Sequence, residues 1–235
     1  MSDFVLVHGA WHGAWCWRRV LPGLWAAGHR AFAVTLSGVG ERAHQLTAGI
    51  TLDTHIEDVC RVIEAEELTD AILVGHSYAG MVITGVADRL HDRLSQLVYL
   101  DAVVPLPGEA WSSRHPAATQ AERRELIRHT GSLPPAPPSA FGLVDDDAAW
   151  VARRQTPHPG GVYDSVLQFD AGRWASLPRH FIDCTEPALA TIAASRQRVR
   201  EQPGWQVQEI ATGHDAMISA PGSVLGMLLA MATPQ

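Results

Sequence analysis

Two residues that together can activate a hydroxyl group lie far apart in the chain: Ser77, in the segment 75–80 (GHSYAG), and His214, in the segment 212–217 (TGHDAM). A serine becomes a nucleophile when a nearby histidine takes its proton and a carboxylate orients that histidine. The chemistry that this combination predicts is acyl transfer to water through a covalent serine intermediate.

The surroundings of Ser77 predict a sharp turn between a buried strand and a helix. The apolar run 71–74 stops at Gly75, and a helix-compatible segment begins at Tyr78 with small residues after it. Small residues are needed because strand and helix approach each other closely around such a turn. One departure from the Gly-x-Ser-x-Gly pattern is Ala79, which is small enough to keep this interpretation. A serine that merely caps a helix is the alternative for the motif taken alone.

A second glycine-containing loop, the segment 8–15 (HGAWHGAW), follows the first predicted strand. A tetrahedral oxyanion needs two N–H donors that point at one position. We expect the backbone N–H of Tyr78, directly after the nucleophile, to be one donor and that of Ala10 to be the other. A dinucleotide-binding turn is the alternative, but the loop lacks the Gly-x-Gly-x-x-Gly spacing.

These motifs belong to an alternation of strands and helices that is typical of a parallel sheet. His214 follows the last predicted strand, where it can face the turn at Ser77. The strands are expected at 4–8, 30–36, 71–74, 94–100, 180–184 and 205–210, and the helices at 15–27, 52–66, 78–90, 188–200 and 221–232. The fold class is therefore α/β, a mostly parallel sheet of about six strands with helices on both faces.

The alternation breaks in one long stretch, residues 105–178, which is rich in proline and in scattered aromatic residues. So long an insertion exceeds a plain connection between strands. We expect it to form a cap over the carboxyl edge of the sheet, with a core made of residues 1–104 and 179–235. Some of its aromatic side chains should line a substrate pocket, and the candidates are Trp111, Phe141, Trp150, Tyr163, Phe169 and Trp174.

Composition excludes several function classes. The formal net charge of −7 argues against nucleic-acid binding, which calls for basic patches. No secretory signal and no apolar run of about 20 residues is present, so we expect no membrane partner. Three widely spaced cysteines fit reduced thiols in a cytoplasmic protein. His8 and His12 have a helical ligand spacing, but the glycines around them disfavour a helix, so neither a metal nor another cofactor is expected.

The chain resembles the α/β-hydrolase superfamily, in particular the compact branch of plant methylesterases, hydroxynitrile lyases and related bacterial esterases. The resemblance rests on segments 4–15, 75–81, 97–101, 184–186 and 213–217 and leaves the cap loosely matched. It implies that Ser77 is the nucleophile and His214 the base, with the N–H groups of Ala10 and Tyr78 as oxyanion donors.

The acid of the triad is where the sequence departs from these relatives. The plant members place an aspartate directly after Cys-Thr-Glu, and this chain has Pro187 there. The candidates that remain are Asp101, Glu186 and Asp183. Asp183 lies within a strand, where we expect it to pack or to face away. Asp101 ends the strand after the Ser77 helix and could reach the same histidine, so it is favoured over Glu186, which stays open.

The resemblance also separates ester hydrolysis from cyanide chemistry. Hydroxynitrile lyases of this branch carry a lysine directly after the catalytic histidine, where this chain has Asp215. They also have an acidic residue at the position of His76 and a threonine at that of Gly9. The resulting hypothesis is a serine hydrolase of small hydrophobic or aryl carboxylic esters. A cofactor-free oxygenase, a lyase-type enzyme and a non-catalytic receptor are the alternatives, and a homodimer is left open.

Overall fold

The core of the protein is a parallel β-sheet whose strands the sequence pattern had placed within about two residues. The computed structural model describes residues 1–232. Within them, six parallel strands run in the order β2-β1-β3-β4-β7-β8. Their bounds are β1 Asp3–Val7, β2 Arg30–Val34, β3 Ala71–His76, β4 Leu94–Leu100, β7 Arg179–Cys184 and β8 Trp205–Ile210. The prediction of a six-stranded parallel sheet is confirmed.

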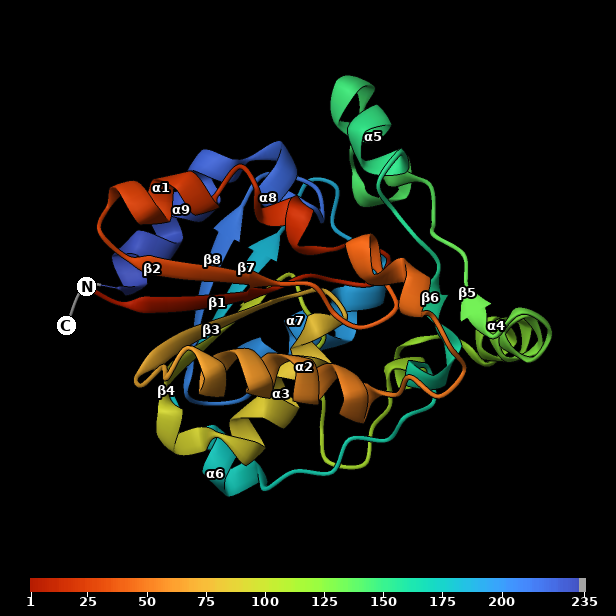
Figure 1. The fold of residues 1–235 in the computed structure, drawn as a ribbon, viewed down its shortest axis with the longest axis horizontal. Helices are drawn as coiled ribbons and strands as arrows, with labels where there is room; N and C mark the ends of the chain where they lie inside the picture. The colour runs from red at the N-terminus through yellow and green to blue at the C-terminus, as the bar shows by residue number, and fades with distance from the viewer. Residues whose placement is uncertain (233–235) are drawn as a thin grey trace.

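Helices cover both faces of this sheet, as predicted (Figure 1). Side chains alternate along each strand, so each face buries its own apolar layer. In β1, Phe4 packs in the layer on the side of α1 and α9, whereas Val5 packs in the layer on the side of α2 and α3. The bounds are α1 Leu21–Ala26, α2 Leu52–Ala65, α3 Ala79–Arg89, α7 Ala193–Glu201, α8 Ala216–Ser219 and α9 Pro221–Met231.

Two predicted helices are wrong in their extent. The helix expected at 188–200 begins only at Ala193, as α7, after a 3₁₀ turn at Ala190–Ile192. The segment 15–27 forms a 3₁₀ turn at Ala14–Trp17 and then a separate short helix, α1. Pro22 lies in the first turn of α1. Because proline lacks an N–H donor and fits the start of a helix better than its interior, the chain begins a new helix there.

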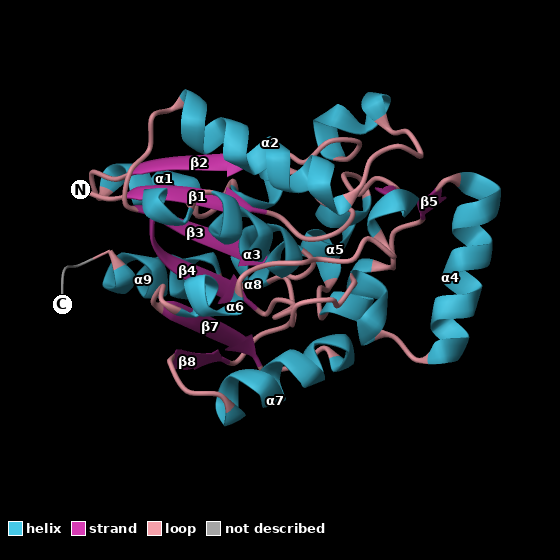
Figure 2. Ribbon diagram, turned by 90° about the horizontal axis from the view of Figure 1, so that it is seen from below, coloured by secondary structure: helices cyan, strands magenta, loops and turns pink. Residues whose placement is uncertain are grey.

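The insertion 105–178 contains further elements that the sequence pattern did not show. Figure 2 places α4 and α5 beyond the carboxyl ends of the strands, whereas Figure 1 shows α6 below the sheet, next to α3. The side chain of Trp174 in α6 donates to the hydroxyl of Tyr99 in β4 at 2.9 Å. The bounds are α4 Ala117–Thr130, α5 Asp145–Ala152, α6 Ala171–Ala175 and a two-stranded antiparallel pair, β5 Ser132–Leu133 and β6 His158–Pro159. Between residues 1 and 232 no helix is both long and apolar enough to cross a membrane.

Candidate active site

Ser77 stands on a strained turn between β3 and α3. Its φ is +56°, a left-handed conformation that is unusual for serine. The turn is held on both sides, since the N–H of Ser77 donates to the carbonyl of Leu100 at 3.2 Å and its own carbonyl accepts from Val103 at 2.9 Å. A Cβ on Gly80 would lie 1.8 Å from the Val103 carbonyl oxygen, so this position requires glycine. Ala79 has no positive φ, which is why alanine serves there.

The imidazole ring of His214 lies between Ser77 and Asp101. Its Nε2 lies 2.8 Å from Oγ of Ser77 and its Nδ1 lies 2.6 Å from Oδ2 of Asp101. A carboxylate only accepts, so Nδ1 carries the proton and Nε2 accepts from the serine hydroxyl. The backbone of the loop is fixed as well, because the N–H of His214 donates to the carbonyl of Phe141 at 2.9 Å. The structure thus joins three predicted side chains, from the ends of β3, β4 and β8, in one hydrogen-bonded chain.

Asp101 is buried and held in place by an arginine that sequence reasoning missed. Arg196 of α7 donates to its Oδ1 at 2.7 Å, while Oδ2 receives the proton of His214. The same guanidinium also pairs with Asp183. The arginine orients the carboxylate and balances part of the buried negative charge. No motif in the sequence marks Arg196, because its role depends on where α7 packs.

The other two acid candidates lie elsewhere. Asp183 is buried between Arg196 and Arg200, at 2.6 Å from the latter, and so packs away from His214. Glu186 is exposed, and among the described residues its carboxylate makes no hydrogen bond to His214. Of the three candidates, Asp101 alone is placed to orient His214.

The loop after β1 presents backbone donors beside Ser77. The amides of Ala10 and Tyr78 donate to no acceptor within residues 1–232, which leaves both free for a ligand. A Cβ on Gly9 would lie 2.7 Å from Cβ of Ser77, so glycine lets the loop approach this closely. The peptide between Gly9 and Ala10 is held by His8, whose Nδ1 donates to the Gly9 carbonyl at 2.7 Å.

His8 is a neutral positioning group that the sequence analysis did not assign. Its Nε2 accepts from the N–H of Leu36 at 3.1 Å, while its Nδ1 donates to Gly9. Burial lowers the pKa of His8 to about 3, so the ring stays uncharged at neutral pH. By holding one side of the Gly9–Ala10 peptide, the ring fixes the direction of the Ala10 N–H on the other side.

A second histidine–aspartate pair lies behind the first. His12 donates through Nδ1 to the Ala10 carbonyl at 2.8 Å and through Nε2 to Asp215 at 3.3 Å. Burial alone would lower the pKa of His12, but the Asp215 carboxylate outweighs it and leaves that pKa raised. Burial would likewise raise the pKa of Asp215, but His12 holds it down at about 2. The two residues therefore form a buried ion pair that joins the loop 8–15 to the segment after β8.

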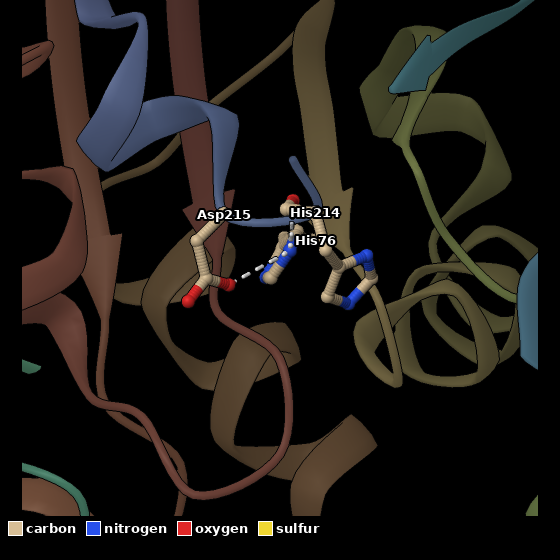
Figure 3. Close-up of side chains that lie close together, drawn as sticks. All are labelled: His76, His214 and Asp215. Atoms are coloured by element: carbon tan, nitrogen blue, oxygen red, sulfur yellow. Dashed lines mark hydrogen bonds and ion pairs between the residues drawn. The ribbon is translucent and has the colours of Figure 1, made fainter. Parts of the chain in front are cut away.

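His76 connects the two pairs, as Figure 3 shows with Asp215 on one side and His214 on the other. Its Nε2 donates to the His214 carbonyl at 3.0 Å and lies 3.5 Å from Oδ1 of Asp215. Burial lowers the pKa of His76 well below its usual value. Ligand atoms of these three residues lie within 4.8 Å of one another, as in a metal site. A metal there would have to displace a hydrogen bond that His214 makes to Ser77 or Asp101.

A cavity of about 170 Å³ opens above Ser77 and His214. Two of the six aromatic residues proposed for a pocket, Trp111 and Phe141, line it, together with Trp11 from the loop after β1. Tyr163 packs against Trp111 instead, at 5.6 Å between ring centres. The remaining three pack away from the cavity: Trp150 against Trp15, and Phe169 and Trp174 against each other. Trp11 was missed, although its place directly after Ala10 was a usable signal.

Similarity to known proteins extends over nearly the whole chain. A family model described as "Alpha/beta hydrolase family" matches residues 4–225. A carbendazim hydrolyzing esterase of Nocardioides sp. (strain SG-4G) is 42% identical over 98% of this chain and 100% of that protein. Methylesterase 2 of Arabidopsis thaliana is 36% identical over 98% of this chain and 96% of its own length. An extracellular alpha/beta-hydrolase from a Paenibacillus species has a similar solved structure, with a TM-score of 0.85, 21% identity and 98% of each chain covered.

Proposed function

The chain belongs to the alpha/beta hydrolase family, and we propose that this member cleaves small hydrophobic or aryl carboxylic esters through an acyl-enzyme on Ser77. It is a carboxylesterase-like hydrolase with the α/β-hydrolase fold, since the curated relatives that match nearly its full length are named as esterases. The observation that carries the proposal is the hydrogen-bonded chain from Ser77 through His214 to Asp101 at the floor of a cavity.

The proposed acylation step starts at Oγ of Ser77. His214 takes the hydroxyl proton on Nε2 as Oγ bonds to the ester carbonyl carbon, and Asp101 stabilises the imidazolium that forms. The negative charge that develops on the carbonyl oxygen is held by the free amides of Ala10 and Tyr78. His214 then protonates the departing alkoxide, and the alcohol leaves with an acyl group on Ser77.

Deacylation repeats the same steps with water as the nucleophile. His214 takes a proton from water, the new tetrahedral oxyanion occupies the same pair of amides, and Ser77 leaves with the proton returned by His214. No group other than these residues and water is needed. Residues 105–178 act in this proposal as the cap that shapes the cavity, through Trp111 and Phe141.

The substrate class follows from the size and lining of the cavity. A space of about 170 Å³ lined by Trp11, Trp111 and Phe141 suits compact apolar or aryl groups. One relative is named for the hydrolysis of carbendazim, so that compound is a second probe for this chain.

A panel of p-nitrophenyl esters of increasing acyl length, with carbendazim beside it, tests the proposal. We expect turnover of the short esters and a fall in kcat/KM as the acyl chain outgrows the cavity. A fluorophosphonate probe should label Ser77, as mass spectrometry of the digested protein would show. The proposal fails if no ester is cleaved and Ser77 stays unlabelled, and oxygen consumption in place of ester cleavage would point to an oxygenase.

A further inference from the structure

The cavity above Ser77 has charged walls as well as apolar ones. Besides His214, three residues of basic type line it, Arg114, His115 and Arg123, and no aspartate or glutamate of the described residues does so. An apolar ester offers nothing to a guanidinium, which holds five N–H donors in a fixed plane. The ester group itself is already served by the amides of Ala10 and Tyr78.

Arg123 of α4 is fixed in position without a counter-ion. Between residues 1 and 232 no carboxylate lies within 4 Å of its guanidinium. It donates to Nε2 of His115 at 3.0 Å and lies over the rings of Trp111 and Tyr163 at 5.9 and 5.7 Å. The side chain is therefore oriented, but its charge is not neutralised.

The group that holds Arg123 is itself uncharged. His115 accepts from Arg123 on Nε2, so its proton is on Nδ1, which donates to the hydroxyl of Tyr163 at 3.2 Å. Burial, with the charge of Arg123 beside it, lowers the pKa of His115 to about 4. At neutral pH this contact orients the guanidinium and supplies no negative charge.

Neighbouring arginines on the same helix show that this arrangement is not general. Arg124 makes two hydrogen bonds to Asp164, both at 2.9 Å, and Arg128 is paired with Glu125 at 2.6 Å. Both of these ion pairs are exposed on the outer side of α4. Of the three, only Arg123 lines the cavity, and only it lacks a carboxylate among the described residues.

Arg114 adds a second positive group with an unused donor. It is buried, and its Nε has no acceptor within the described part of the chain. Its partner Glu109 is shared with Arg198, so one carboxylate serves two guanidinium groups. Burial lowers the pKa of Arg114 to about 10, which leaves it charged at neutral pH. The potential at this part of the cavity is therefore positive.

We propose that Arg123, supported by Arg114, forms a carboxylate subsite, so that the preferred substrates are esters that carry a free carboxylate remote from the ester bond. Half-esters of dicarboxylic acids are the simplest members of this class. The inference rests on the proposed function and makes its substrate class more specific. A guanidinium binds a carboxylate through two parallel N–H donors, and the carboxylate here would replace the missing counter-ion of Arg123.

Matched pairs of methyl esters test the subsite. The anionic set is the monomethyl esters of succinic, glutaric and adipic acid. The neutral set is methyl butanoate, pentanoate and hexanoate, in which a methyl group replaces each carboxyl group. We expect the best half-ester to exceed its neutral counterpart in kcat/KM, and the preferred chain length reports the distance from Ser77 to the guanidinium.

Variants of α4 identify the residue responsible. Arg123→Gln should lower kcat/KM for the best half-ester roughly 10- to 100-fold, the usual worth of a charged hydrogen bond, and for the neutral ester less than about threefold. Arg123→Lys should retain part of the preference. Arg128→Gln removes the same charge from the exposed side of the helix and should change neither set. An equal loss on both sets in Arg123→Gln would show that the arginine only shapes the cavity.

Binding to an inactive protein keeps the subsite testable apart from turnover. Calorimetric titration of Ser77→Ala with the half-esters and their neutral counterparts, repeated in Ser77→Ala/Arg123→Gln, measures the preference directly. Tighter binding of a half-ester that disappears with Arg123→Gln supports the subsite even if the wild-type protein cleaves no ester, an outcome that would overturn only the proposed function. Equal binding of the two sets overturns the subsite, whatever the turnover.

Discussion

Two buried histidine–aspartate pairs lie close together in this protein, and His76 contacts both. The pair that we propose to react, called the reacting pair below, is His214 with Asp101, whose facing atoms are 2.6 Å apart, and the structural pair is His12 with Asp215, at 3.3 Å. The ring of His76 lies 4.6 Å from that of His214 and 6.1 Å from that of His12. By residue type, burial and pairing the two are nearly alike.

The two pairs differ in what the second ring nitrogen does. In His214 that nitrogen accepts from Ser77 at the floor of the cavity, whereas in His12 it donates to the carbonyl of Ala10. A histidine that uses both nitrogens as donors is held as a cation and has no lone pair for a substrate proton. The comparison teaches that a carboxylate partner alone does not make a histidine a base. Whether a histidine can act as a base depends on a ring nitrogen that carries no proton and on the access of that nitrogen to the cavity.

The largest expected effect is on the reacting pair and its serine. Ser77→Ala and His214→Ala should each lower kcat by about 10⁴-fold or more, because nucleophile and base act as one unit. The double variant should be hardly worse than either single one. Steady-state kinetics on p-nitrophenyl esters measure this, with circular dichroism as the control for folding. If the free-energy losses of the two single variants added up in the double variant, His214 would not be the base for Ser77.

The next largest effect on turnover distinguishes Asp101 from Glu186 as the acid that orients His214. Asp101→Asn should lower kcat by roughly 10³- to 10⁴-fold, because an amide stabilises the wrong tautomer of His214 and removes the charge beside its imidazolium. Glu186→Gln, which makes the same chemical change at an exposed position, should cost less than about threefold. The two variants are compared at saturating ester concentration. If Glu186→Gln were the more damaging, the acid would be supplied after β7 rather than after β4.

A small effect on turnover, but the largest effect on stability, is expected for the structural pair. Asp215→Asn leaves His12 without its counter-ion and should lower the free energy of unfolding by about 3 kcal/mol. Because Asp215 lies behind the site, kcat per folded molecule should change only a few-fold. Chemical denaturation measures the stability. The matched control is Asp53→Asn, which removes the exposed carboxylate partner of Arg89 and should lower the free energy of unfolding by under about 1 kcal/mol. Unchanged stability in Asp215→Asn would contradict the ion pair.

The structural pair also predicts a dependence of stability on pH. Asp215 has a pKa of about 2 in the folded protein against an ordinary value of 3.8, so its contribution is present above pH 3.8 and is lost as the pH falls towards 2. The pKa of His12 is raised above 6.5, so its contribution is present below 6.5 and is lost as the pH rises through the raised value. The stability difference between the wild-type protein and Asp215→Asn should therefore be greatest between about pH 4 and 6.5. A difference that is constant from pH 3 to 9 would rule out this linkage.

Much of the fold and part of the site could be predicted because their signals are local. The turn at Ser77 and the loop at Ala10 are each contained in a few consecutive residues, and the strands follow from runs of buried apolar side chains. The prediction of one helix over 15–27 was wrong because the apolar pattern continues across Pro22, whereas a helix cannot easily continue through a proline. The short strands β5 and β6 carry no such signal, since each has only two residues and their pairing joins Ser132–Leu133 to the distant His158–Pro159.

The sequence by itself determined where the candidate catalytic residues stand along the chain: a serine follows β3, an aspartate follows β4 and a histidine follows β8. Which carboxylate reaches His214, which histidine becomes the neighbouring cation, and which arginine faces the cavity were decided only by the tertiary structure. Each of these depends on the direction of a side chain across a gap between elements distant in the sequence. A pattern of residue types specifies local conformation and burial, but hydrogen-bond partners are chosen by packing.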